Sequence, residues 1–225
     1  MLLDRVYKRI RNEFFIRDDF DRIHGTETSL LVHRWRLGIG STAQRYQATP
    51  PEVFARACQF LPSEAKTYPF FDLGCGKGRV LIMARECGFQ RIVGVELSNP
   101  LIKICQRNLS KLGITNVSVV AENAATVTLP DSPVVVFMFN PFKPPLFNAV
   151  VERLTKHRYP LFLIYVTPLY RSVIEQTGRF AAILDDGLLV CQTRERSDEM
   201  WQNHESRAVA PEGEPLAWRA PHRQT

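Results

Sequence analysis

The chain has 225 residues, of which 45% are hydrophobic and 23% charged, proportions that are usual for soluble globular proteins. Its fourteen phenylalanines exclude a chain that is disordered throughout, and no apolar run approaches the ~20 residues that a membrane-spanning helix needs. The net charge of +6 is spread thinly, whereas nucleic-acid binders usually concentrate it in a patch, so we expect neither a nucleic-acid nor a membrane partner.

The five cysteines and five histidines show neither the spacing of a disulfide framework nor that of a metal site. We therefore expect free thiols and no metal. The N-terminal stretch lacks the continuous apolar segment of a secretory signal, which favours a cytoplasmic protein. Nothing in the sequence indicates a particular oligomeric state.

The first predicted elements are helices. Apolar residues at helical spacing predict an amphipathic helix over residues 2–16, and residues 1–48 are interpreted as a helical lid. Thr49 and Glu52 have the capping-box spacing, and prolines stand at the first helical positions, so a helix is expected from about 50 to 60.

Strand and helix patterns then alternate along the middle of the chain. The predicted strands are 68–73, 91–95, 117–121, 134–139 and 161–166, the predicted helices are 79–86, 98–112, 145–157 and 171–176, and a hairpin is predicted at 180–184 and 188–193. This order predicts an α/β fold with a Rossmann-like, seven-stranded, mostly parallel sheet, helices on both faces and an N-terminal helical extension. The domain is expected to span 49–196, followed by a polar, partly disordered tail over 197–225.

A glycine-rich turn follows the first predicted strand and opens a helix. It contains Asp72, Gly74, Cys75, Gly76 and Gly78. Glycines let the backbone approach a ligand closely, and the first N–H groups of a helix are free to donate. A phosphate loop is excluded because Gly78, rather than Ser or Thr, follows Lys77. In a dinucleotide-binding motif the third glycine would come one position later.

The pattern Asp72-x-Gly74-x-Gly76-x-Gly78 resembles motif I of the class I S-adenosylmethionine-dependent methyltransferases. The resemblance implies that the acid and the turn hold the amino-acid end of S-adenosylmethionine. Glu96, followed by Leu97, ends the next predicted strand, where the family uses an acid to bind the ribose. A carboxylate there can accept hydrogen bonds from two vicinal hydroxyls.

Other cofactor contacts are implied by the same resemblance. Asn123, followed by Ala124, stands in the register of the family's acid that binds the adenine amino group. Tyr46 and Thr49 look like the segment before motif I in protein-lysine methyltransferases of the non-SET kind, where such residues close over the cofactor. Thr49 is also explained as a plain helix cap. Phe139 ends the fourth strand, at the ligand-binding edge of the sheet.

Asn140, Pro141 and Phe142 are the predicted catalytic residues. They resemble, imperfectly, the Asn-Pro-Pro-aromatic motif of amino-methyltransferases, in which the asparagine orients a planar amino group. Phe142 replaces the second proline, so the transfer of roles reaches Asn140 and Pro141 only. For a lysine amine, Phe139 and Phe142 are predicted to line an apolar channel. The structural alternative is a Phe142 side chain packed inward.

The sequence thus favours a methyltransferase that uses S-adenosylmethionine and transfers the methyl group to a nitrogen of a protein or small molecule, or to an oxygen. Two alternatives stay open. A nicotinamide-dependent oxidoreductase shares the glycine turn and the ribose acid, and it would need room for a pyrophosphate near Gly78. A non-catalytic module could keep the cofactor pocket without turnover.

Overall fold

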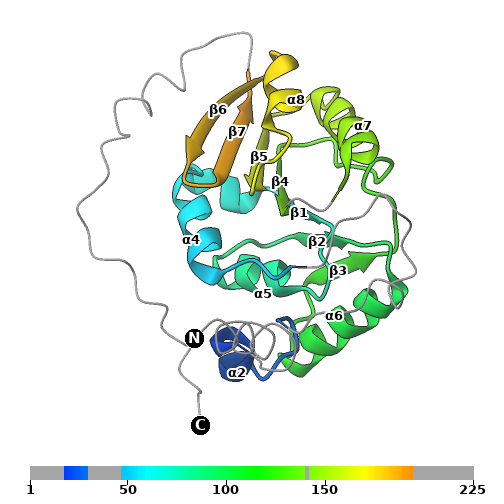
Figure 1. The fold of residues 1–225 in the computed structure, drawn as a ribbon. Coiled ribbons are helices and arrows are strands. Elements are labelled where there is room, and N and C mark those ends of the chain that lie inside the picture. Colours follow the sequence, from blue (N-terminus) through cyan, green and yellow to red (C-terminus); the bar gives the residue numbers. More distant parts are fainter. Residues whose placement is uncertain (1–17, 30–46, 140–141, 195–225) are drawn as a thin grey trace, which may run out of the picture.

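The computed structural model describes residues 18–29, 47–139 and 142–194 (Figure 1). Seven strands form one sheet in the order β3-β2-β1-β4-β5-β7-β6, which confirms the predicted Rossmann-like α/β fold. Their bounds are β1 Phe70–Leu73, β2 Ile92–Val95, β3 Val117–Val120, β4 Val134–Phe139, β5 Leu161–Val166, β6 Phe180–Asp185 and β7 Leu188–Thr193.

The helices are interleaved with these strands. Their bounds are α2 Asp19–His24, α4 Pro51–Gln59, the 3-10 helix η1 Ser63–Thr67, α5 Arg79–Glu86, α6 Asn99–Lys111, α7 Pro144–Thr155 and α8 Arg171–Gln176. In these described segments no helix is long and apolar enough to cross a membrane. The predicted helix 2–16 and the predicted tail 197–225 lie outside the described residues.

The sheet is parallel from β3 to β5, and β7 is antiparallel to both of its neighbours, β5 and β6. The late hairpin forms the antiparallel edge of the sheet, with its second strand, β7, inside the sheet and its first strand, β6, at the margin. The burial of the two strands explains this order. All of β7 is buried, whereas buried positions are rare along β6, so β7 takes the covered place.

Two hydrophobic clusters cover the two faces of the sheet. Neighbouring residues of β1 point to opposite faces, so Phe70 joins one cluster and Phe71 the other. The first cluster is built with α4, α5 and α6, and the second with α7 and α8 (Figure 1). Covering both faces explains why the central strands are apolar without interruption.

The start of α4 differs from the prediction. Its cap is Pro50, which has no side-chain hydrogen bond, so the capping box of Thr49 and Glu52 is not formed. The physical reason is the pair Pro50-Pro51. A residue that precedes proline is pushed to the extended conformation, and Pro50 has φ −62° and ψ 136°, so the helix begins at Pro51.

Helix α2 was not predicted, because six residues show little periodicity. Its ends nevertheless carry ordinary signals. The side chain of Asp18 accepts from the backbone N–H of Asp21 at 3.1 Å, and Gly25 closes the helix with φ 66°.

Candidate active site

The candidate site lies at the carboxyl ends of β1, β2 and β4. The chain leaves β1 toward β2 on one side, whereas β4 pairs on the other side of β1. Open α/β sheets bind ligands at such a point, in the crevice where the strand order reverses. The glycine turn and Glu96 follow β1 and β2 directly at this edge.

The glycine turn between β1 and α5 depends on left-handed backbone conformations. Gly74, Gly76 and Gly78 have φ values of 90°, 54° and 86°, which other residues rarely adopt. A Cβ atom on Gly78 would lie 2.5 Å from the Sγ atom of Cys105 in α6. The turn therefore needs glycine at this position both for its conformation and for the close approach of α6.

Glu96 is tied to the backbone at both carboxylate oxygens. Oε2 accepts from the N–H of Gly76 at 3.0 Å, and Oε1 accepts from the N–H groups of Leu97 and Ser98 at 2.9 and 2.8 Å. Burial raises the pKa of Glu96, and these three hydrogen bonds oppose that effect. A carboxylate offers about four lone-pair positions, so Glu96 keeps capacity for a further donor while it fixes the glycine turn.

Asp72 is a buried carboxylate in the third position of β1, with 3% of its surface exposed. Among the described residues, none donates a hydrogen bond to it or forms an ion pair with it. Burial, and to a smaller extent the charge of Glu96, raises its pKa well above the ordinary value. A positively charged ligand beside this carboxylate would stabilise its charged form.

Cys75 offers the site its backbone rather than its thiol. The side chain is buried against β2, because a Cβ atom on Gly94 would lie 2.7 Å from its Sγ atom. A hydrogen bond with Cys105, together with burial, raises the pKa of the Cys75 thiol. The thiol is therefore not a nucleophile, and any contact of Cys75 with the cofactor is expected through its main chain.

Leu97 follows the predicted ribose acid at the end of β2, and Asn123 and Ala124, the predicted adenine segment, follow β3. The Leu97 side chain is 53% exposed, which is unusual for a leucine beside so much buried structure. The Oδ1 atom of Asn123 accepts from the N–H of Ala125 at 2.9 Å, so this oxygen already serves the local turn. Ala124 is buried in the second cluster. Cofactor contact by these three residues stays a prediction.

The predicted channel phenylalanines are separated. Phe139 packs against the first cluster, while Phe142 is 7% exposed and belongs to the second, on the other face of the sheet. Thr49 is buried ahead of α4. Tyr46, Asn140 and Pro141 lie outside the described residues, so their predicted roles are neither supported nor opposed by the geometry.

Sequence reasoning missed three polar residues that hold the turn. Lys77, Arg79 and Asn108 are 0%, 4% and 5% exposed, and all three contact the segment 18–29, here called the brace. Charged residues that alternate with glycines were a usable signal, because lysine and arginine are almost never fully buried without partners. Those partners lie 50 or more positions away in the sequence, beyond the reach of local patterns.

The strand order and this edge are those of a Rossmann-like domain. Solved structures support the fold. A Pyrococcus horikoshii protein has a TM-score of 0.53 at 15% identity. The match covers 77% of this chain and 94% of the Pyrococcus chain. The T. thermophilus 16S rRNA methyltransferase solved with AdoMet and guanosine has a TM-score of 0.52 at 16% identity. The match covers 67% of this chain and 44% of that one.

Residues 70–159, less than half of the chain, match the family model described as a methyltransferase domain. A protein-lysine N-methyltransferase of Saccharolobus islandicus is 32% identical over 92 residues, 40% of this chain and 56% of that protein. A tRNA (guanine-N(7)-)-methyltransferase of Prochlorococcus marinus is 34% identical over 79 residues, which are 32% of this chain and 37% of that protein. The chain thus matches about half or less of each curated relative's length.

Proposed function

We propose that this protein transfers the methyl group of S-adenosylmethionine to a nitrogen, on a protein side chain or a small molecule, with an oxygen acceptor as the less favoured case. The observation that carries the proposal is Asp72, a buried carboxylate without a partner in the described part of the chain, next to a left-handed glycine turn. S-Adenosylmethionine carries an ammonium and a sulfonium, and a positive group of this kind could pair with the Asp72 carboxylate.

The residues of the site fit the different parts of the cofactor. Asp72 would face the ammonium, and the N–H groups of the turn would face the carboxylate. Glu96 has lone-pair capacity for a ribose hydroxyl, and the exposed Leu97 offers an apolar surface for adenine. These assignments extend the motif resemblance and are supported by the burial and hydrogen bonds around the turn.

The bound cofactor supplies an activated methyl group. This methyl group would pass to the lone pair of the acceptor, and the electron pair of the broken carbon–sulfur bond would return to sulfur. The protein mainly aligns the three atoms, and such positioning can contribute roughly 7–11 kcal/mol. Asn140 and Pro141 are proposed to orient the acceptor amine, with Phe142 supporting them from the core. A base is needed only where the acceptor must lose a proton.

The choice of nitrogen is supported by the curated relatives. By their names, the Saccharolobus protein methylates a lysine nitrogen and the Prochlorococcus protein methylates N7 of guanine. The two acceptors differ in charge and size, which leaves the acceptor class to experiment.

Calorimetry tests the cofactor. S-Adenosylmethionine should bind the wild-type protein, and Asp72→Asn should weaken binding by roughly 30-fold, since a charged partner is worth about 2 kcal/mol. Binding of NAD without binding of S-adenosylmethionine would refute the proposal. Radiolabelled methyl transfer into a cell extract, separated into protein, RNA and small-molecule fractions, would then identify the acceptor.

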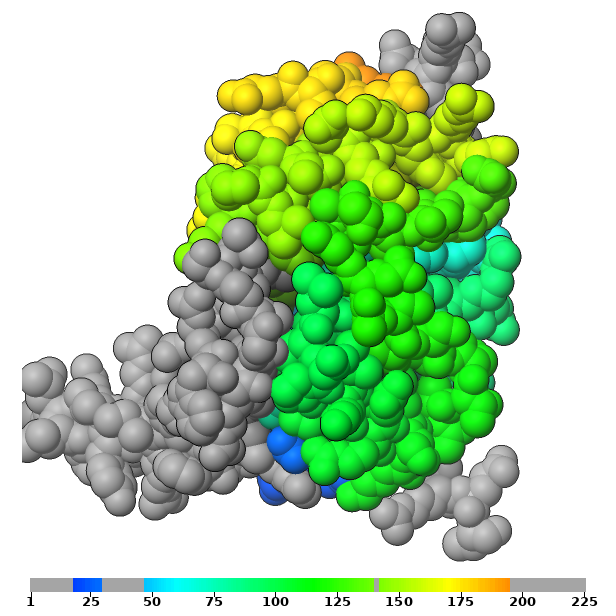
Figure 2. Space-filling model, turned by 90° about the vertical axis from the view of Figure 1, so that its right-hand side faces the viewer, coloured from blue at the N-terminus to red at the C-terminus, as the bar shows by residue number. Residues whose placement is uncertain are grey.

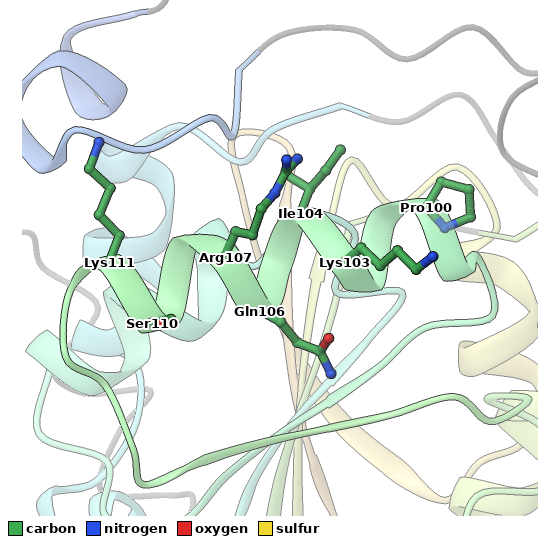
Figure 3. Close-up of a pocket in the computed structure, with 7 residues that line it drawn as sticks. All are labelled: Pro100, Lys103, Ile104, Gln106, Arg107, Ser110 and Lys111. Carbon is green, nitrogen blue, oxygen red and sulfur yellow. The ribbon is translucent and has the colours of Figure 1, made fainter.

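A nucleic-acid acceptor is the second candidate, although the thinly spread charge predicts otherwise. Helix α6 presents Lys103, Arg107 and Lys111 at a spacing of four residues, and the sequence has no acidic residue from Ser98 to Ala121. Among the described residues, neither Lys103 nor Arg107 forms an ion pair. A hollow of about 870 Å³ runs along this helix (Figure 3), lined by Pro100, Lys103, Ile104, Gln106, Arg107, Ser110 and Lys111.

The α6 surface can be tested separately from the cofactor. If a phosphate backbone lies on it, replacing both Lys103 and Arg107 by alanine should weaken binding of tRNA. It should also lower the slope of log K against log salt by about 1.8, or 0.9 for each lost phosphate contact. The exposed pair Glu152 and Lys156 on α7 provides a control, Lys156→Ala, that leaves the slope unchanged. An unchanged slope in the double variant would remove nucleic acid as a candidate at this surface.

A further inference from the structure

The brace, residues 18–29, is fastened to the two cationic residues of the glycine turn. The Nζ atom of Lys77 lies 3.3 Å from a carboxylate oxygen of Glu27. The Nε atom of Arg79 donates to the hydroxyl of Thr28 at 2.7 Å, and its guanidinium lies 2.7 Å from the Asp18 carboxylate. Lys77 and Arg79 alternate with Gly76 and Gly78, so the brace holds every second residue of this part of the turn.

The brace has a rigid interior of its own, centred on Asp21. This fully buried carboxylate accepts hydrogen bonds from the Thr26 hydroxyl and from both the backbone N–H and the hydroxyl of Thr28 and Ser29, at 2.6–2.8 Å. Burial alone would raise the pKa of Asp21, but these hydrogen bonds lower it to about 2. The segment that grips the turn is therefore an organised loop.

Asn108 of α6 joins the brace to the turn through a single amide group. Its Oδ1 atom accepts from the N–H of Glu27 at 3.0 Å, and its Nδ2 atom donates to the carbonyl oxygens of Glu27 and Lys77 at 3.2 and 3.0 Å. Cys105, one helical turn earlier on the same face of α6, lies against Gly78. Figure 2 shows the brace (blue) lying against the surface that includes α6 (green).

The peptide group between Lys77 and Gly78 is consequently fixed at both ends. Its carbonyl oxygen accepts from Asn108, and its N–H donates to the carbonyl of Cys75 at 2.9 Å. The N–H of Gly76, two peptide groups earlier, donates to the Glu96 carboxylate. A turn whose peptide groups are already oriented loses less conformational entropy when a ligand binds.

We propose that Asn108 is a positioning residue for cofactor binding, and that through it the brace holds the glycine turn in the conformation that receives S-adenosylmethionine. The inference rests on the proposed function of the site. Asn108 itself contacts the Lys77 carbonyl, so it acts through the backbone of the turn.

The test compares Asn108→Ala with Asn116→Ala in the full-length protein. Asn116 is an exposed asparagine that also donates from its amide to a backbone carbonyl, that of Gln90 at 3.3 Å, far along the chain from the turn. Loss of the Asn108 bonds should raise the Kd and KM for S-adenosylmethionine about tenfold, with kcat within about twofold. Asn116→Ala should change none of these values.

Two further readouts separate this role from general destabilisation. Without cofactor, amide hydrogens of residues 76–79 should exchange faster in Asn108→Ala, while those of β5 keep wild-type protection. Glu27→Ala removes the Lys77 ion pair and keeps the backbone bonds to Asn108, so its Kd should rise only about two- to threefold. Wild-type affinity in Asn108→Ala, or equal acceleration of exchange in β5, overturns the inference. Absence of binding by the wild-type protein overturns the proposed function instead.

Discussion

In the half of the sheet that holds β1, β2 and β3, charged groups are buried around the strand ends, whereas the half that holds β4, β5 and β7 buries mainly apolar side chains. Ten of the twelve buried polar residues in the described segments precede Leu109, and the other two, Gln192 and Thr193, end β7. The first half has strands of four residues and the second has strands of six. Most of the buried polar groups in the described segments thus lie in one half of the domain, around the predicted cofactor site.

The largest effect is expected in the apolar half. Phe147 of α7 is fully buried between the rings of Tyr165 and Tyr170, at centroid distances of 5.2 and 5.4 Å. Phe147→Ala should lower the free energy of unfolding by about 3–5 kcal/mol, measured by urea denaturation. The folded variant should bind S-adenosylmethionine with wild-type affinity, and a Kd raised more than threefold would break the division between the halves.

A smaller loss of stability is expected at Gly78 in the polar half. Gly78→Ala combines a left-handed backbone with a clash against Cys105, so the free energy of unfolding should fall by about 2–4 kcal/mol. Gly113 also has a left-handed φ, 63°, but open space around it, and Gly113→Ala should cost only about 1 kcal/mol. Cofactor affinity should fall in the first variant alone. Equal costs in the two variants would show that the contact with α6 is not restrictive.

Glu96→Ala should weaken the binding of S-adenosylmethionine by roughly 100-fold in calorimetry, because the ribose partner and the tie to Gly76 are both lost. The control is Glu152→Ala, which removes an exposed carboxylate paired with Lys156 on α7. A Kd within fivefold of the wild-type value would place the ribose elsewhere.

The brace gives a pH-dependent effect on stability of about 2 kcal/mol. The pKa of Asp21 is about 2 in the folded protein, whereas an aspartate in the unfolded chain has its ordinary pKa of 3.8. A lowered pKa stabilises the fold above pH 4, and this contribution is lost as the pH falls from about 4 to 2. Urea denaturation of wild type and Asp21→Asn should therefore give stabilities that converge over this range, and parallel curves would contradict the assignment.

Much of the fold could be predicted because its signals are local. The strands Val134–Phe139 and Leu161–Val166 begin and end where their apolar runs do, and the hairpin is marked by Asp186 and Gly187. The order of β6 and β7 depends on which strand is the more apolar and covered, and the cap of α4 depends on the Pro50-Pro51 pair. To predict the strand order or the helix cap from the sequence, several rules would have to be weighed against one another.

The residues of the candidate site also differ in whether the sequence could predict them. Asp72 lies near the end of β1, Gly76 lies in the turn after it and Glu96 follows β2, so sequence position alone placed them at one edge of the sheet. Asn108 could not be found in this manner, because its partners Glu27 and Lys77 are 81 and 31 positions away. Pairing over such distances follows from packing, which a single sequence does not display.

The position of β7 has a consequence for synthesis on the ribosome. β5 pairs on one side with β4, and on the other side with β7, which begins 22 residues after Val166. At about 5–20 residues per second, this apolar strand edge waits roughly one to five seconds until its neighbour, which ends at Thr193, is complete. An unpaired edge invites pairing with another chain, so the yield of folded protein should depend on how fast ribosomes translate the segment 167–193.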